Sequence, residues 1–131
     1  MSRNLTAIVI LAIGALFSIL ILAVIGQNPE DDSVENQNVF IENGKQVIEI
    51  VAKGGFRPRV TQAKSGMPTV LRIKTNNTFD CSSTIVIPAL QYRARLESSG
   101  ITEVEIPMQP AGKNIRGICA MGMYGFNIQF N

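Results

Sequence analysis

The chain has 131 residues, with twelve lysines and arginines, ten aspartates and glutamates, no histidine, and a net charge of +2. This length is enough for one ordinary domain and an appendage. The lack of histidine excludes Ser-His and Cys-His nucleophiles, histidine-based zinc sites and imidazole acid–base catalysis. Carboxylates are few and no glycine-rich phosphate loop is present, so we expect no enzyme.

An uncharged apolar run, "LTAIVILAIGALFSILILAVI", extends from Leu5 to Ile25. A helix needs roughly 20 apolar residues to cross a bilayer. The apolar region of a secretory signal is shorter, about 7–15 residues, and precedes a small-residue cleavage site. Since "VIG" before Gln27 is a poor site of that kind, we predict a transmembrane signal anchor at residues 5–26. A cleaved signal peptide is the second interpretation.

The charges beside this run predict its orientation. Arg3 lies before it, in the short segment 1–4, and acidic residues follow it. Positive charge tends to stay in the cytoplasm, so residues 1–4 are expected there. The protein is thus predicted to be a single-pass cell-membrane protein with a periplasmic or cell-surface C-terminal domain. The polar, acidic segment 27–37, "QNPEDDSVENQ", is expected to be a flexible linker.

Residues 38–131 show the period-2 alternation of β-strands. The runs are "QVIEIVA", "TVLRIKT", "STIVIPA", "TEVEIPM", "IRGIC" and "GFNIQF". "STIVIPA" is more continuously apolar, as expected of a strand covered on both faces. Turn sequences such as "NG" at 43–44 and "GG" at 54–55 separate the runs. The spacing predicts six to eight strands in an antiparallel β-sandwich or barrel.

The same domain carries eleven basic residues and six acidic ones, a net charge of +5. The basic residues are scattered along the strands, and few aromatic residues lie among them. We therefore expect a solvated sheet surface and no nucleic-acid binding.

The sulfur atoms are the remaining candidates for chemistry. Cys81 precedes a predicted strand, and Cys119 ends another, directly before Met121 and Met123 in "GICAMGMYGF". Thiolate and thioether are soft donors that favour Cu(I), whereas thioether is a poor ligand for zinc. The Cys-x-Met-x-Met spacing suits a tight loop around one ion. Met67 and Met108 are expected to fill gaps in the core.

Several stretches resemble a cupredoxin-like domain, in the variant found in bacterial envelope proteins that handle copper and, in some cases, iron. They are "GGFRP", "SGMPTVLRIKTNN", "CSSTIVIPAL" and "EIPMQPAGKNIRGICAMGMYGFNIQF", and the resemblance covers residues 46–131. It implies a Greek-key β-sandwich with the metal ligands in two loops at one end. Cys81 falls where blue-copper members have their first histidine, and Cys119 matches the loop cysteine. Met121 falls near the second histidine, and Met123 matches the axial methionine.

Both histidines of the blue-copper pattern are missing from this chain. A His₂Cys site supports the Cu(II)/Cu(I) couple, so an all-sulfur site is expected to hold copper as Cu(I). We therefore expect a membrane-anchored, extracytoplasmic copper-binding protein for copper trafficking, buffering or resistance. Its expected partner is a copper transporter or metallochaperone.

Two other interpretations remain open. On the resemblance, Cys81 and Cys119 come from adjacent loops, within the roughly 4.4–6.8 Å between Cα atoms that a disulfide requires. A disulfide-stabilised interaction module without metal is therefore the alternative, and electron transfer of the cupredoxin type is the third candidate. A disulfide alone leaves Met121 and Met123 unexplained.

Overall fold

A computed structural model describes residues 2–25 and 37–131 of the chain, which divide into two compact units. The first contains one helix, α1 (Ser2–Ile25), so the predicted helix begins before residue 5. Within the described residues, no helical segment is both long enough and apolar enough to span a bilayer. The linker predicted at 27–37 lies, except for its last residue, outside the described residues.

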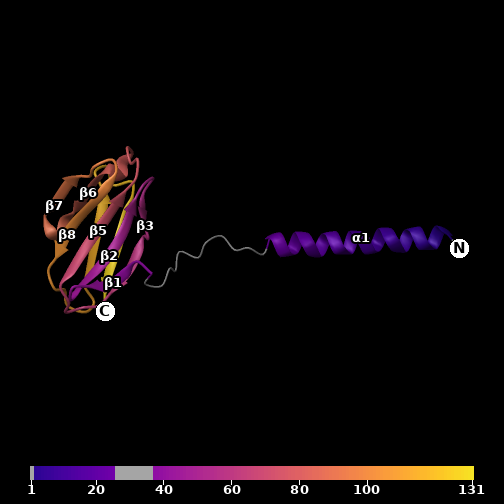
Figure 1. Cartoon of the computed structure of the whole chain (residues 1–131), viewed down its shortest axis with the longest axis horizontal. Helices are drawn as coiled ribbons and strands as arrows, with labels where there is room; N and C mark the ends of the chain where they lie inside the picture. The colour runs from indigo at the N-terminus through magenta and orange to yellow at the C-terminus, as the bar shows by residue number, and fades with distance from the viewer. Residues whose placement is uncertain (1, 26–36) are drawn as a thin grey trace. The chain divides into compact units, whose positions relative to one another are not determined.

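The second unit is a sandwich of two β-sheets (Figure 1). One sheet has the strand order β1-β2-β5-β8, with β3 paired to β2, and the other has the order β4-β10-β9-β6-β7. The strands are β1 (Val39–Glu42), β2 (Lys45–Ala52), β3 (Phe56–Arg57), β4 (Val60–Ala63), β5 (Thr69–Thr75), β6 (Thr84–Ile87), β7 (Tyr92–Arg95), β8 (Gly100–Ile106), β9 (Asn114–Cys119) and β10 (Gly125–Phe130).

The sheets are mixed, which corrects the expectation of antiparallel pairing throughout. β2 lies parallel to β5, with Ile48 opposite Leu71, and β10 lies parallel to β4, with Ile128 opposite Thr61. Parallel neighbours need a crossover between them. Between β2 and β5 the chain crosses to the other sheet as β4, which the sequence analysis did not separate as a strand.

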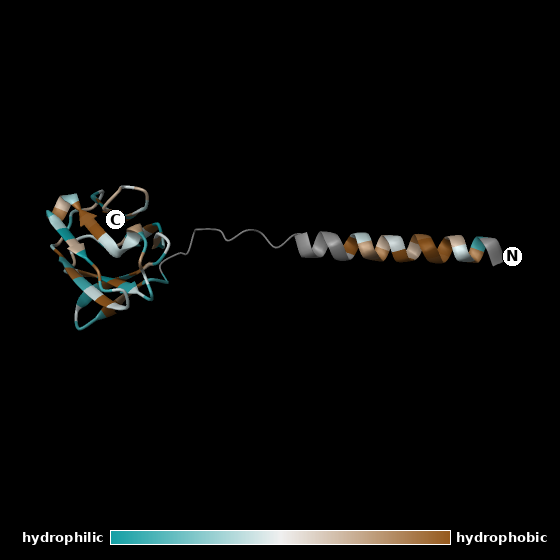
Figure 2. Ribbon diagram, turned by 90° about the horizontal axis from the view of Figure 1, so that it is seen from above, coloured by the Kyte–Doolittle hydropathy of each residue, from teal (hydrophilic) through white to brown (hydrophobic). Residues whose placement is uncertain are grey.

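The core lies between the sheets, and the predicted alternation is confirmed. Inward residues of both sheets are buried in one cluster, and hydrophobic and hydrophilic residues alternate along the strands in Figure 2. The buried residues include Ile48, Ile50, Ala52, Leu71, Ile73, Val104, Ile106, Phe126, Ile128 and Phe130. The rings of Phe56 and Phe126, one from each sheet, meet edge to face with centroids 5.3 Å apart.

Two details differ from the expectation. β6 alternates like its neighbours, with Ile85 and Ile87 buried and Val86 half-buried, because only one face of this sheet meets the core. Met67 is half-buried and the Met108 residue is 66% exposed, so Met108 fills no gap in the core. The Asn43–Gly44 turn is confirmed: both residues have positive φ, as a two-residue hairpin between β1 and β2 requires.

Candidate metal centre

Cys81 and Cys119 come together at one end of the β4-β10-β9-β6-β7 sheet. Cys81 begins the short 3₁₀ turn Cys81–Ser83, which leads directly into β6, and Cys119 is the last residue of β9. Ile85 of β6 pairs with Cys119, so strand pairing alone brings the two segments together. The Cα atoms lie 5.7 Å apart and the sulfur atoms are joined as a disulfide. Cys119 is fully buried, whereas Cys81 is half-buried.

The Asp80 carboxylate fixes the backbone that carries Cys81. It caps the 3₁₀ turn by accepting hydrogen bonds from the Ser82 N–H, at 2.7 Å, and from the Ser82 hydroxyl. It also accepts the Gly54 N–H at 2.9 Å, which ties the turn between β2 and β3 to the same place. The pKa of Asp80 lies below its ordinary value, first because the Ser82 hydroxyl donates to the carboxylate and second because the Gly54 N–H does so. The ionised Asp80 carboxylate is therefore the form that these hydrogen bonds stabilise.

The loop between β9 and β10 carries the two methionines. Cys119 and Tyr124 close it, since the Cys119 N–H donates to the Tyr124 carbonyl at 3.0 Å and the Cys119 carbonyl accepts the Gly122 N–H at 2.9 Å. The Tyr124 N–H points to the Cys119 sulfur at 3.4 Å. Met121 and Met123 are 76% and 65% exposed, so neither contributes much to the core.

The Tyr124 ring at the end of this loop lies beside Gly55. Gly55 has φ +122°, and a Cβ added to it would lie 3.5 Å from that ring. A cavity of about 260 Å³ lies beside this loop, and most of its lining is formed by Gly54, Gly55, Arg57, Arg59, Met123 and Tyr124. Met123 therefore lines the same cavity as Arg57 and Arg59.

The structure thus brings two of the four predicted ligands together and leaves the other two exposed on the adjoining loop. Within residues 2–25 and 37–131, no group of three histidine, cysteine, aspartate or glutamate side chains is placed to hold a metal. Any soft-metal site here consequently depends on the methionine thioethers together with the two cysteines. In the disulfide state the cysteines present no thiolate, which is the form that binds metal.

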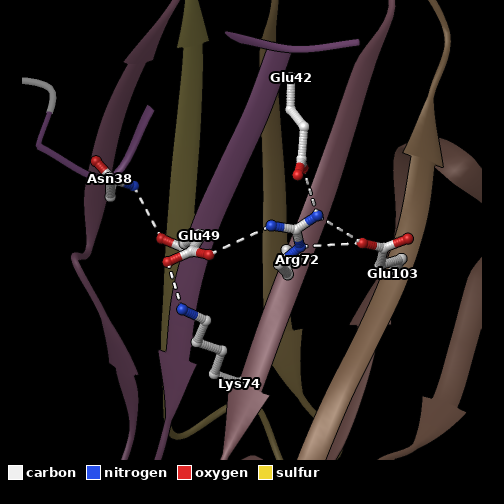
Figure 3. A network of polar contacts seen from close by, with 6 residues as sticks. All are labelled: Asn38, Glu42, Glu49, Arg72, Lys74 and Glu103. Atoms are coloured by element: carbon white, nitrogen blue, oxygen red, sulfur yellow. Dashed lines mark hydrogen bonds and ion pairs between the residues drawn. The ribbon is translucent and has the colours of Figure 1, made fainter. Parts of the chain in front are cut away.

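A cluster of three glutamates on the other sheet is not a second candidate. Glu42, Glu49 and Glu103 converge on the Arg72 guanidinium at 2.7, 3.5 and 2.9 Å (Figure 3). Glu42 and then Glu103 raise the pKa of Arg72 above its ordinary value. Lys74 also contacts Glu49, at 2.6 Å. The carboxylates are neutralised by side chains rather than left to bind a cation.

Comparison with known proteins supports the fold. No protein-family model and no curated protein match the chain. One similar structure is the metal-binding domain of the Streptococcus pneumoniae D39 Cu(I)-exporting P-type ATPase CopA, solved with Cu(I). The match has a TM-score of 0.63 and 20% identity, and it covers 71% of this chain and 92% of that one. A copper binding protein solved by NMR in its apo form is similar with a TM-score of 0.64 and 25% identity, over 73% of this chain and 97% of that one.

Both neighbours are copper-binding domains, and the sandwich of this chain has their fold. The expected fold class is confirmed at this level. The contact between Asp80 and Gly54 was not predicted from the sequence. The pattern Asp-x-Ser at 80–82 signals the cap, but no local pattern shows that Gly54 lies beside it.

Proposed function

We propose that this protein binds copper as Cu(I) through Cys81, Cys119, Met121 and Met123, as cargo for trafficking, buffering or resistance rather than for catalysis. The observation that supports the proposal is the meeting of the two cysteines, beside an exposed methionine loop, on a sandwich with the fold of copper-binding domains. The donor set fits this cargo, since thiolate and thioether are both soft ligands.

Binding requires the disulfide to be reduced first. A dithiol reductant supplies two electrons and two protons, its own sulfurs become a disulfide, and Cys81 and Cys119 become thiols. Each thiol then loses its proton as it binds Cu(I). The Tyr124 N–H already points to the Cys119 sulfur and is placed to stabilise its thiolate.

The helix α1 is proposed to anchor the protein in a membrane. Its run from Leu5 to Ile25 carries no charge, and its large apolar residues from Leu5 to Ile19 are 50–73% exposed. A helix that is apolar all round is normally buried in protein or lipid. With Arg3 on the cytoplasmic side, the sandwich would lie outside the cell membrane. Carbonate extraction of membranes and protease protection of the intact cell test the anchor and its orientation.

A copper transporter or metallochaperone is the proposed partner. One structural neighbour is a domain of a Cu(I)-exporting ATPase, and a shared fold is weak support for a shared pathway. The lack of histidine supports a binding role instead of an enzymatic one.

An anaerobic competition titration of the reduced protein against a coloured Cu(I) chelator tests the site. We expect one Cu(I) per chain, lost in the double variant Cys81→Ser, Cys119→Ser. The matched variant Met67→Leu, Met108→Leu changes two methionines outside the site and should bind as the wild type does. Equal binding by the cysteine variant and the wild type contradicts the proposal.

The disulfide itself favours a second candidate, a disulfide-stabilised interaction module that binds no metal. Native mass spectrometry of protein purified anaerobically with its thiols reduced separates the two: a metal-free mass after copper exposure favours the module. Electron transfer, the third candidate, predicts strong visible absorption from a Cu(II) form. The absence of histidine argues against it.

A further inference from the structure

The charges of the sandwich are divided unequally between its two sheets. Four of its six acidic residues lie on the β1-β2-β5-β8 sheet and pair with Lys45, Arg72 and Lys74 (Figure 3). They are Glu42, Glu49, Glu103 and Glu105. The Asp80 carboxylate is occupied by hydrogen bonds from Ser82 and Gly54, and the sixth acidic residue, Glu97, lies in the loop after β7. Most of the net positive charge therefore belongs to other parts of the sandwich.

The β4-β10-β9-β6-β7 sheet has the opposite character. Its five strands contain three arginines, Arg93, Arg95 and Arg116, and no acidic residue. All three are exposed, and none takes part in an ion pair within the described part of the chain. Strand pairing places them on one surface: Arg93 pairs with Val86, and Val86 pairs with Ile118, two residues from Arg116.

Two of these arginines lie close to the cysteines along their strands. Arg95 pairs with Thr84, the residue after the turn that holds Cys81. Arg116 lies three residues before Cys119 on β9. On the other side, Arg57 and Arg59 line the cavity that Met123 faces. The Arg59 carbonyl accepts the N–H of Asn127, which pairs with Arg116, so the backbone at Arg59 runs beside β10. Arg57 ends β3, which pairs with β2 of the other sheet.

We propose that this arginine face, defined by Arg57, Arg59, Arg93, Arg95 and Arg116, docks the acidic surface of a partner protein that exchanges copper with the chain. The inference rests on the proposed function for the exchange, but the docking chemistry stands on charge alone. All five cations are arginines, whose planar guanidinium accepts a carboxylate in a two-point contact. Complementary charge speeds encounter and orients the partner over the Met121–Met123 loop, where copper must pass.

A glutamate-rich peptide of about ten residues is the probe for this surface, because exposed ion pairs weaken when salt screens them. The full chain in mild detergent is titrated with it, and NMR shifts of backbone amides report binding. The test variant is Arg95→Gln, Arg116→Gln. The matched control is Lys64→Gln, Lys113→Gln, which removes the same charge near Phe130 and Asn131, at the far end of the strands.

The arginine variant is expected to bind the peptide about fivefold more weakly because two exposed ion pairs are lost, while the lysine variant matches the wild type. Shifts should map to β6, β7 and β9 and fade as salt is raised. Equal weakening in the two variants overturns the proposal, since only net charge then matters. Binding of anionic lipid vesicles without binding of the peptide also overturns it, in favour of a membrane surface.

Failure of this proposal and failure of the copper site are distinguishable. Both variants leave all four proposed ligands in place, so their Cu(I) affinity should equal that of the wild type. If peptide binding follows the arginines in a chain that takes up no Cu(I), the docking face stands and the copper site does not. A normal Cu(I) titration with no peptide binding overturns the docking face alone.

Discussion

Reduction of the Cys81–Cys119 disulfide should destabilise the sandwich strongly. The bridge joins residues 38 positions apart, and a closed loop of that length removes about 13 cal/mol/K of unfolded-chain entropy, or about 4 kcal/mol at 25 °C. The loop contains β6, β7, β8 and β9, so both sheets depend on the constraint.

Urea unfolding of the oxidised and reduced protein measures this effect without removing any side-chain carbon. With a slope of about 1–3 kcal/mol/M, a loss of about 4 kcal/mol lowers the midpoint by about 1.3–4 M. The variant Cys81→Ala, Cys119→Ala is the control, and its midpoint should not respond to the reductant. Cu(I) added to the reduced wild type should restore part of the loss, because ligation by both cysteines closes the same loop. Identical midpoints for oxidised and reduced wild type would refute the reasoning.

Three further outcomes follow from the packing, the cap and the loop. Gly117→Ala would make its Cβ overlap the ring of buried Phe126, so we expect a loss of about 1–3 kcal/mol in unfolding free energy. Adding Phe126→Leu should partly restore the stability of this variant. Additive losses in a double-mutant cycle would contradict the clash. The pKa of Asp80 is lowered by folding, so this carboxylate stabilises the fold above its unfolded pKa, near 3.8, and the contribution is lost as pH falls through the lower folded pKa. Asp80→Asn should therefore reduce the fall of the thermal unfolding midpoint at acid pH. An unchanged fall in this variant would contradict the argument. Replacing exposed Met121 and Met123 by leucine should change the unfolding free energy by less than about 0.5 kcal/mol and should weaken Cu(I) binding in the chelator titration. A Cu(I) affinity equal to that of the wild type would exclude the thioethers as ligands.

Alternation of apolar and polar residues was sufficient to predict the longest strands. In β5 and β10 the alternating apolar residues, such as Leu71 and Ile128, are buried as the pattern predicts, although Val70 of β5 is buried as well. Short strands carry too few residues for a pattern, which is why β1, β3, β4 and β7 were not separated. Parallel pairing of β4 with β10 joins distant segments and depends on the whole topology, so no local sequence predicts it.

The candidate site was predictable in part. The sulfur residues are conspicuous in a chain without histidine, and the resemblance placed Cys81 beside Cys119, as the structure does. The contact of Gly54 with Asp80 and the packing of Gly55 under Tyr124 were not foreseen, because they are tertiary contacts between residues far apart in the sequence. Whether Met121 and Met123 bind copper stays a prediction for the titration.

The closure of the loop at residues 119–124 has a consequence for the thermodynamics of metal capture. Two of its hydrogen bonds use the Cys119 N–H and carbonyl, and only the third, from the Tyr124 N–H, uses the sulfur, so the loop can keep its shape in either thiol state. Ordering a free backbone costs about 1–2 kcal/mol per residue, and that cost is met during folding. What remains at capture is mainly the loss of rotamer freedom in Met121 and Met123. The loop is in this sense preorganised, and a substitution that opens it, away from every sulfur, should weaken capture entropically.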